Sequence, residues 1–420
     1  STLDRSSAAS DVYKRQLYNN MNLTKRLLEI LSVATKLGVT SFGGPIAHLG
    51  YFRDEYVKKR GWLSEEKYAG IISLCQVLPG PTSSQVGIMI GMYRAGISGG
   101  IVAWIGFTLP STIVLLAFAM GVNNLEGLQD SGWLHGLKVL AVAIVAMALW
   151  GMFKTICTTK STTTVAVISA TAILILSIPL IQIAVISSGA LVGYLFLKPT
   201  IQSSSDTNEF SINKNISIMS LLLFVCLIIA FPLLSNTISN PFLGVSDKFF
   251  RTGSLVFGGG HVVLPLLQNE VVTPGLVSQD AFLAGYGAAQ AIPGPLFTFS
   301  AYLGTVMPSF NNSPLIGLLC LTMIFIPSFL LIIGVMPFWN TLNSKVWFRG
   351  PLVGINASVV GLLMAALYDP IWVSAVESNT DVATVAGLIC IVSIWKCPIW
   401  LVVLIASALG EIFSRNLLPL

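Results

Sequence analysis

Long apolar runs separated by short polar segments fill most of this chain. No Asp, Glu, Lys or Arg lies between Lys160 and Lys198, and none lies between Asp280 and Lys345. Only a lipid bilayer can hide uncharged stretches of that length. The pattern therefore predicts an all-α polytopic membrane protein.

Four of the apolar runs are broken near their centre by glycine and proline. Phe-Gly-Gly-Pro at 42–45 and Pro-Gly-Pro at 79–81 break two runs in the first half, and Phe-Gly-Gly-Gly at 257–260 and Pro-Gly-Pro at 293–295 break two in the second. Proline lacks a backbone N–H and glycine adds backbone freedom, so each break ends a helix. We expect each broken run to form a re-entrant hairpin of two half-helices.

The breaks belong to a motif that occurs twice. In each half a cation stands six residues before Phe-Gly-Gly, and Gln-x-x-Pro-Gly-Pro follows about thirty residues later. The register offset is 215 at the start and 214 at the end, so Lys36 falls on Arg251 and Glu55 on Glu270. The chain therefore holds two internal repeats. Two later echoes support the alignment: Pro110-Ser111 against Pro327-Ser328, and Gly136-Leu137 against Gly354-Ile355.

Unbroken apolar runs supply the remaining membrane segments. They lie at 101–120, 139–153, 165–197 (two short helices with a turn near Pro179), 216–234, 315–336, 351–367, 382–394 and 398–412. We expect about nine full spans and four hairpins, or thirteen apolar segments in all. The run at 216–234 has no partner in the other half, and such an unpaired span would invert the second repeat.

The placement of charge indicates that the two repeats are inserted in opposite senses. The loop after the first Phe-Gly-Gly carries five cations, and its counterpart at 268–280 carries none. A later loop is acidic in the first half and basic in the second. By the positive-inside rule the N-terminus is then cytoplasmic and the C-terminus outside. Reading the hairpins as ordinary spans keeps both ends, so the charges support the inversion better than the hairpins. The residues compared are Arg53, Lys58, Lys59, Arg60 and Lys67, then Glu126 and Asp130 against Lys345 and Arg349.

These patterns divide the chain into five parts. Residues 1–22 are polar without an apolar h-region, which predicts a disordered extension rather than a secretory signal. Repeat 1 spans 23–198, a cytoplasmic linker 199–214, the inverting span 215–235 and the inverted repeat 2 residues 236–415.

Composition narrows the function classes. The chain is 54% hydrophobic and 10% charged, with a mean hydropathy of +0.80 and a net charge of +5. The cations are scattered, which argues against a nucleic-acid partner. Six cysteines without a CxxC pair and three histidines predict inert thiols and no metal or other cofactor. No catalytic or nucleotide-binding motif is present, so we expect neither an enzyme nor an ATP-driven pump.

Inverted repeats with broken helices are typical of secondary transporters, whose half-helix N-termini face an anion at mid-membrane. Lys36 and Arg251 hold the same repeat position in apolar surroundings, where a cation costs roughly 2.5–3.5 kcal/mol. One interpretation is a cation pair near the repeat axis that binds a divalent oxyanion. The alternative is that each cation extends to the interface or pairs with Glu29, Glu55 or Glu270.

Polar residues and backbone at the breaks complete the candidate substrate site. Gln76, Gln290 and the hydroxyls beyond each Pro-Gly-Pro would donate to oxygen ligands, although such groups also bond helix to helix. Glu55 and Glu270 are candidates for proton coupling, or for capping or gating. His48 and His261 do not align, which favours local hydrogen bonding. The candidate set is Phe42, Gly43, Gly44, Gln76, Pro79, Gly80, Pro81 and Ser83, with Ser84 and Gln85 beside it, and Phe257, Gly258, Gly259, Gln290, Pro293, Gly294, Pro295 and Thr298, with Ser300 beside it.

The paired motifs resemble the chromate ion transporter family, in its long two-domain form, over roughly residues 27–412. The resemblance implies a carrier of the cytoplasmic (inner) membrane that exports chromate and confers chromate resistance; some relatives are tied to sulfate. The motif residues of both halves would then form the pathway, with an oxyanion and the bilayer as partners. A sulfate or other oxyanion carrier, or an anion channel on the same scaffold, stays open, as does the oligomeric state.

Overall fold

The structure is a computed structural model, and it describes residues 22–42, 44–124, 132–176, 181–197, 212–257, 260–343 and 345–414. Every regular element within those ranges is helical, as the apolar pattern predicts. The expected N-terminal extension, most of the linker, the acidic loop with Glu126 and Asp130, and the turn near Pro179 lie outside the described residues. So do Gly43, Gly258 and Gly259 of the candidate site.

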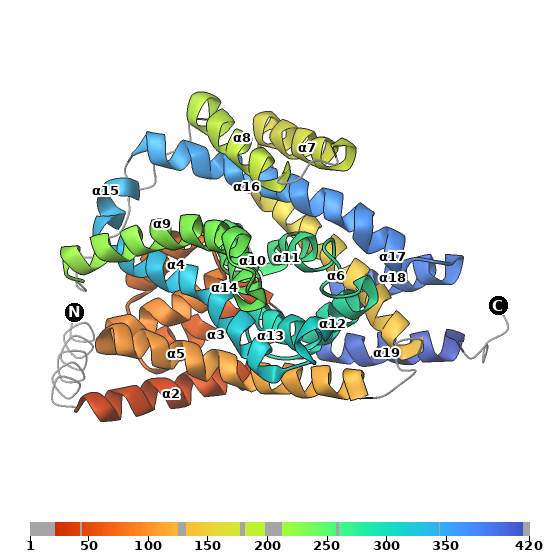
Figure 1. The fold of residues 1–420 in the computed structure, drawn as a ribbon. Helices are drawn as coiled ribbons and strands as arrows, with labels where there is room; N and C mark the ends of the chain where they lie inside the picture. The colour runs from red at the N-terminus through yellow and green to blue at the C-terminus, as the bar shows by residue number, and fades with distance from the viewer. Residues whose placement is uncertain are drawn as a thin grey trace, which may run out of the picture.

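The helices follow one another in the same order in both halves (Figure 1). The first half contains α2 (Leu23–Thr40), α3 (Gly44–Phe52), the π-helix η1 (Arg53–Lys59), α4 (Glu65–Val77), α5 (Thr82–Asn124), α6 (Gly132–Ile156), α7 (Lys160–Ile175) and α8 (Ile181–Phe196). After α9 (Lys214–Thr237), the second half contains α10 (Pro241–Leu255), η3 (Gly260–Val262), α11 (Val263–Val271), α12 (Gln279–Ala291), η4 (Leu296–Thr298), α13 (Phe299–Thr305), η5 (Pro308–Phe310), α14 (Pro314–Val335), η6 (Met336–Phe338), α15 (Trp339–Asn343), α16 (Val346–Ala366), η7 (Leu367–Trp372), α17 (Val373–Ala375), α18 (Asn379–Ser393) and α19 (Ile399–Ser414).

Five helices among the described residues are long and apolar enough to cross a bilayer, which indicates an integral membrane protein. They are Thr82–Gly121, Gly132–Ile156, Lys214–Thr237, Pro314–Phe338 and Trp347–Ala375. The four apolar helices α7, α8, α18 and α19 are shorter, and 16 residues extend only about 24 Å. These helices fall on the nine unbroken runs of the sequence, but a hydrocarbon core of about 30 Å exceeds the short ones. The count of nine spans therefore stays a prediction.

Each Pro-Gly-Pro run folds back on itself. Lys67 at the start of α4 places its Nζ 3.1 Å from the hydroxyl of Tyr93, although the intervening residues would extend about 39 Å as one straight helix. In the second half the Tyr302 hydroxyl donates to the Ala281 carbonyl at 2.9 Å, which joins α13 to the start of α12. Both runs thus have the hairpin shape that their breaks predict. Their depth in a membrane stays a prediction.

The long element α5 contains a second reversal. Ala95 and Gly96 have non-helical backbone angles, with φ of +67° at Gly96. The backbones of Gly91 and Gly99 lie so close together that neither position has room for a Cβ. Residues 82–94 are therefore the returning half-helix of the hairpin, and residues 97–124 are the following apolar segment.

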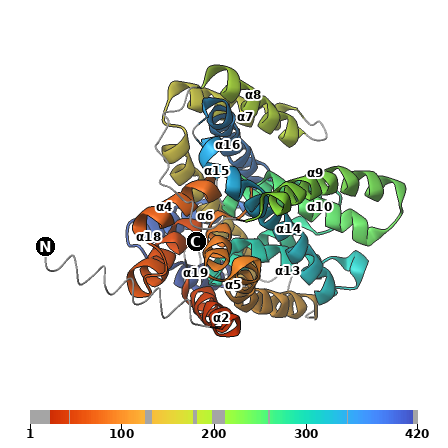
Figure 2. The same cartoon turned by 90° about the vertical axis from the view of Figure 1, so that its left-hand side faces the viewer.

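The last helices of each half pack on the other half, as Figures 1 and 2 show for α7 and α8 beside α16. Reciprocally, α18 and α19 pack on α6. Both contacts use small residues four apart, which lets the helix backbones touch. The pairs are Gly132 and Gly136 against Ala406 and Gly410, and Gly350 and Gly354 against Gly189 and Gly193. This exchange of helices is what two related halves would make, while the inversion itself stays a prediction.

Helix α9, the run without a partner, buries little of its surface. Its apolar side chains are exposed, among them Met219, Leu222 and Leu233. Cys226 on this helix is exposed too, unlike the buried Cys75 and Cys320, and all six cysteines are free thiols. This helix thus differs from the others in facing outward along most of its length.

Candidate functional site

The tips of the hairpins are joined across the two halves. The Gly80 N–H donates to the Val256 carbonyl at 2.7 Å, and the Gly294 N–H donates to the Ser41 carbonyl at 3.0 Å. Gly80 and Gly294 are equivalent in the repeat, and Ser41 and Val256 each precede a Phe-Gly-Gly. Each Pro-Gly-Pro break is therefore bonded to the Phe-Gly-Gly break of the other half.

The two Phe-Gly-Gly breaks also face each other. The Nε2 atom of His261 lies 3.8 Å from the position that a Cβ on Gly44 would take. The Cγ atom of Pro45 lies 3.3 Å from the corresponding position on Gly260. All four breaks thus meet at one place, which we call the junction.

Glycine is required at the two Pro-Gly-Pro breaks. Gly80 and Gly294 have φ of +126° and +113°, values that side chains rarely tolerate. Each also lies against a serine of the opposite half, Ser328 beside Gly80 and Ser111 beside Gly294. These serines are the pair in the echo of the sequence repeat, so the echo marked residues of the junction.

Four helical segments begin at the junction. The helices α3 and α5 start directly after the two breaks of the first half, and η3 and η4 start after those of the second. The first-turn N–H groups of a helix have no intrahelical partner, and the helix dipole makes that end positive. The arrangement therefore favours an anion at the junction.

Polar side chains without partners lie beside the breaks. The Oγ atoms of Ser41 and Ser84 and the Nε2 atom of Gln290 are buried and have no hydrogen-bond partner in the described part of the chain. Ser41 and Ser84 are 0% and 2% exposed. Sequence reasoning left Ser41 out because it looked for donors only beyond Pro-Gly-Pro. Its position directly before Phe-Gly-Gly was the available signal.

Other predicted donors are already engaged. The Ser83 hydroxyl lies 3.2 Å from Nδ1 of His48, and the Thr298 hydroxyl donates to the Pro295 carbonyl at 2.8 Å. The amide of Gln85, just beyond the first Pro-Gly-Pro, donates to the Pro79 carbonyl at 2.7 Å. Gln76 is exposed, whereas its repeat partner Gln290 is partly buried. The two halves thus contribute different side chains.

The two buried histidines beside the junction make local hydrogen bonds. His48 is 1% exposed, bonds Ser83 and packs edge-on against Phe107. Nδ1 of His261 lies 2.8 Å from the hydroxyl of Tyr286. Each histidine therefore joins the two broken runs of its own half.

The two predicted cations pair with carboxylates of their own halves, which is the alternative that the sequence left open. Lys36 lies 3.0 Å from Glu55. Arg251 lies 3.1 Å from Glu270 and 2.9 Å from Asp247. Since Glu55 and Glu270 are equivalent in the repeat, the same ion pair occurs twice. Both pairs stand at the base of a Phe-Gly-Gly hairpin.

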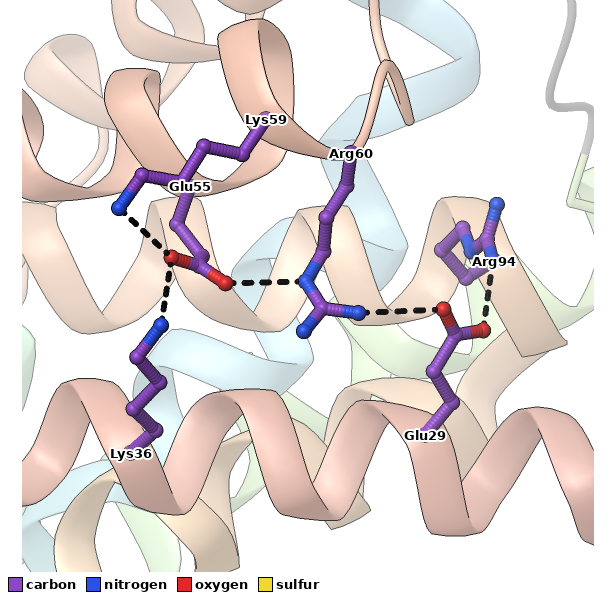
Figure 3. A network of polar contacts seen from close by, with 6 residues as sticks. All are labelled: Glu29, Lys36, Glu55, Lys59, Arg60 and Arg94. Atoms are coloured by element: carbon purple, nitrogen blue, oxygen red, sulfur yellow. Dashed lines mark hydrogen bonds and ion pairs between the residues drawn. The ribbon is translucent and has the colours of Figure 1, made fainter.

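The ion pair of Lys36 belongs to a larger group, drawn in Figure 3. We call it the first-half cluster. Glu55 accepts from Lys36 at 3.0 Å, from Lys59 at 3.5 Å and from Arg60 at 3.0 Å. Arg60 also reaches Glu29 at 3.4 Å, and Arg94 reaches Glu29 at 2.9 Å.

Glu55 remains ionised at neutral pH. Burial raises the pKa of its carboxyl, but the hydrogen bonds from Lys36 and Arg60 outweigh burial, so the pKa lies below its ordinary value of 4.5. A group that carries a coupling proton needs a pKa near the operating pH. The geometry therefore favours a charge-pairing role over a proton-carrying one.

Comparison with known proteins places this geometry among transporters. A family profile described as "Chromate transporter" matches residues 28–194 and 243–411, one match to each half. The chain is 26% identical over 92% of its length to a "Probable chromate transport protein" of Synechococcus elongatus, covering 95% of that protein. It is 25% identical to a "Chromate transport protein" of Pseudomonas aeruginosa (89% of this chain, 88% of that one) and 22% identical to one of Cupriavidus metallidurans (86% of each). No solved structure matches the chain.

Proposed function

The chain belongs to the chromate transporter family, and from this premise we propose that it is a secondary carrier that exports chromate across the cytoplasmic membrane. Chromate is a tetrahedral dianion, and its export would confer resistance to it. Similarity over most of the chain to proteins named for chromate transport supports this substrate.

The observation that carries the proposal is the junction. Four helical segments begin there, and the dipole of each stabilises an anion by about 0.3–1 kcal/mol, or up to about 2 kcal/mol in a partly buried site. The unpartnered groups of Ser41, Ser84 and Gln290 can donate to the oxygens of the bound anion. A dianion without its hydration shell needs such a set of donors.

A carrier fits the junction better than an open channel does. The direct bonds from Gly80 to Val256 and from Gly294 to Ser41 join the breaks of opposite halves and close the space between them. A substrate can pass only when these bonds separate, and the reciprocal contacts give each half an equivalent movement. This supports alternating access around one central site.

The direction of transport follows from the proposed orientation. With the N-terminus in the cytoplasm, an inside-negative potential drives a dianion outward by about 2.3 kcal/mol per charge per 100 mV. Export then requires no ATP. Lys36 and Arg251 would contact the anion as it approaches and leaves the junction, exchanging partners with Glu55 and Glu270.

Uptake of labelled chromate into everted membrane vesicles tests the proposal. The expected result is saturable uptake that falls in Lys36→Ala and Arg251→Ala, with sulfate added as competitor. Uptake equal to that of vesicles without the protein would refute chromate transport. Equal competition by sulfate would change the substrate to tetrahedral dianions in general, and normal uptake in both variants would remove the two cations from the pathway.

A further inference from the structure

We propose that the Glu55 carboxylate occupies the place of a substrate oxyanion in an acquisition site formed by Lys36, Lys59 and Arg60, and that the incoming dianion displaces it. The inference rests on the proposed function, since it names the first site that the exported anion meets. It differs from the junction, which lies at the other end of the same hairpin.

The geometry around Glu55 is that of a bound anion. Its Oε2 atom accepts from the Nζ atoms of Lys36 and Lys59, and its Oε1 atom accepts from Nε of Arg60, so three cations share one carboxylate (Figure 3). A tetrahedral dianion offers four oxygens and twice the charge to the same donors. Charge-assisted bonds to it would therefore be stronger than those to Glu55.

The donors can be reached from solvent although the carboxylate cannot. The side chains of Lys36 and Lys59 are 53% and 65% exposed, whereas that of Glu55 is 6% exposed. An arriving anion would thus meet the ammonium groups first and compete for them from the solvent side. The long lysine side chains can follow the anion without any backbone movement.

The charge around this site is surplus positive on one half only. Between residues 22 and 96 the sequence has nine Lys or Arg and five Asp or Glu; between residues 241 and 311 it has two and three. In the structure the equivalent pair of Arg251 and Glu270 is joined by Lys248 and Asp247, which leaves that group of four neutral. Only the first half therefore attracts anions over a distance.

Displacement of Glu55 also has a consequence for the hairpin. Lys36 belongs to α2 and Glu55 to η1, the two arms of the hairpin whose tip contributes Ser41 and Gly44 to the junction. Their ion pair joins the arms at the base. An anion that takes Lys36 from Glu55 removes that connection, which links arrival of substrate to freedom of movement at the tip.

Glu55→Gln tests the inference, because glutamine keeps the size of the side chain but no longer competes as an anion. In everted vesicles, where the cytoplasmic face is outside, the KM for chromate should fall about fivefold. Lys59→Gln should raise it by a similar factor, and Lys59 is too exposed for the change to affect folding. The control is Glu65→Gln, which breaks the exposed ion pair with Arg53 on the same loop and should leave KM unchanged.

Three outcomes would overturn the inference. One is a KM in Glu55→Gln that is unchanged or higher while wild type transports normally; another is an equal shift in Glu65→Gln. The third is a shift that occurs only in vesicles with anionic lipid and vanishes in phosphatidylcholine alone, since the anion displaced would then be a lipid headgroup. If wild type shows no saturable uptake, the proposed function fails, and chromate-induced thermal stabilisation of purified protein decides the site separately: it should be larger for Glu55→Gln.

Discussion

At the scale of single residues, the two halves share a backbone arrangement but differ in the side chains that they bring to the junction. Gly80 and Gly294 make equivalent hydrogen bonds, whereas Gln290 is partly buried with an unpartnered amide and Gln76 is exposed. Repetition therefore fixes the position of the site, and divergence between the repeats decides which groups can bind in it.

This asymmetry predicts unequal effects of two matched substitutions. Gln290→Ala should raise the KM for chromate about tenfold or more, because a hydrogen bond to a charged group contributes about 1.5–3 kcal/mol. Gln76→Ala, its matched control in the other repeat, should change KM much less. Initial rates of vesicle uptake measure both, and equal effects would show that the junction binds substrate symmetrically.

The carboxylate of Glu55 gives a prediction about pH. Its pKa is lowered in the folded protein, so its ion pairs stabilise the fold above the ordinary pKa of 4.5 and are lost only as pH falls through the lowered value. At saturating chromate, the rate of Glu55→Gln between pH 6 and pH 8 should therefore parallel that of wild type. A wild-type dependence that disappears in the variant would assign proton coupling to Glu55 after all.

At the scale of elements, the contacts between halves depend on small residues. Gly136 of α6 touches the backbone of Ala406 in α19, and Gly354 of α16 touches that of Gly189 in α8. The sequence echo at Gly136 and Gly354 is thus explained by packing, since any larger side chain at either position would separate the helices.

Gly136→Leu and Gly354→Leu should both destabilise the protein, by about 1–3 kcal/mol or more, because overpacking forces neighbouring helices apart. Gly151→Leu is the matched control, since this glycine lies on the same helix α6 with no atom near its missing Cβ. Thermal unfolding of the purified proteins measures the difference. Equal melting temperatures for Gly136→Leu and Gly151→Leu would contradict the packing account.

Much of the architecture could be predicted from sequence, and the limits have physical reasons. Glycine and proline at the breaks predicted hairpin-shaped segments, since both residues act on the local backbone. The hydrogen bond from Gly80 to Val256 could not be predicted, because it joins positions far apart in the chain that become neighbours only after folding. Similarly, the matched positions of Lys36 and Arg251 were evident, but a sequence cannot tell whether a long side chain turns toward the other cation or toward Glu55.

At the scale of the whole molecule, the proposed function depends on the opposite orientation of the two halves. The charge of the loops predicts it, and the reciprocal packing of α8 on α16 and α19 on α6 is what an exchange between related halves would produce. Helix α9, which is mostly exposed, would supply the odd crossing that inverts the second half.

Labelling of two equivalent positions tests the orientation. Lys58 and Thr273 correspond under the repeat offset, and both are exposed. In intact cells an impermeant thiol reagent should label Thr273→Cys but not Lys58→Cys, and in everted vesicles the pattern should reverse. Wild type is the control for the exposed Cys226. Labelling of both variants from one side would rule out inverted halves.

The most direct measurement of the central claim is a cryo-electron microscopy structure of the protein with tungstate, an electron-dense tetrahedral dianion. We predict density at the junction, within hydrogen-bond distance of Ser41, Ser84 or Gln290 and facing the first turns of α3 and α5. Density at the junction that weakens when chromate is added would support one shared site for both dianions. Tungstate that is transported by this protein but leaves the junction empty at saturating concentration would contradict the account.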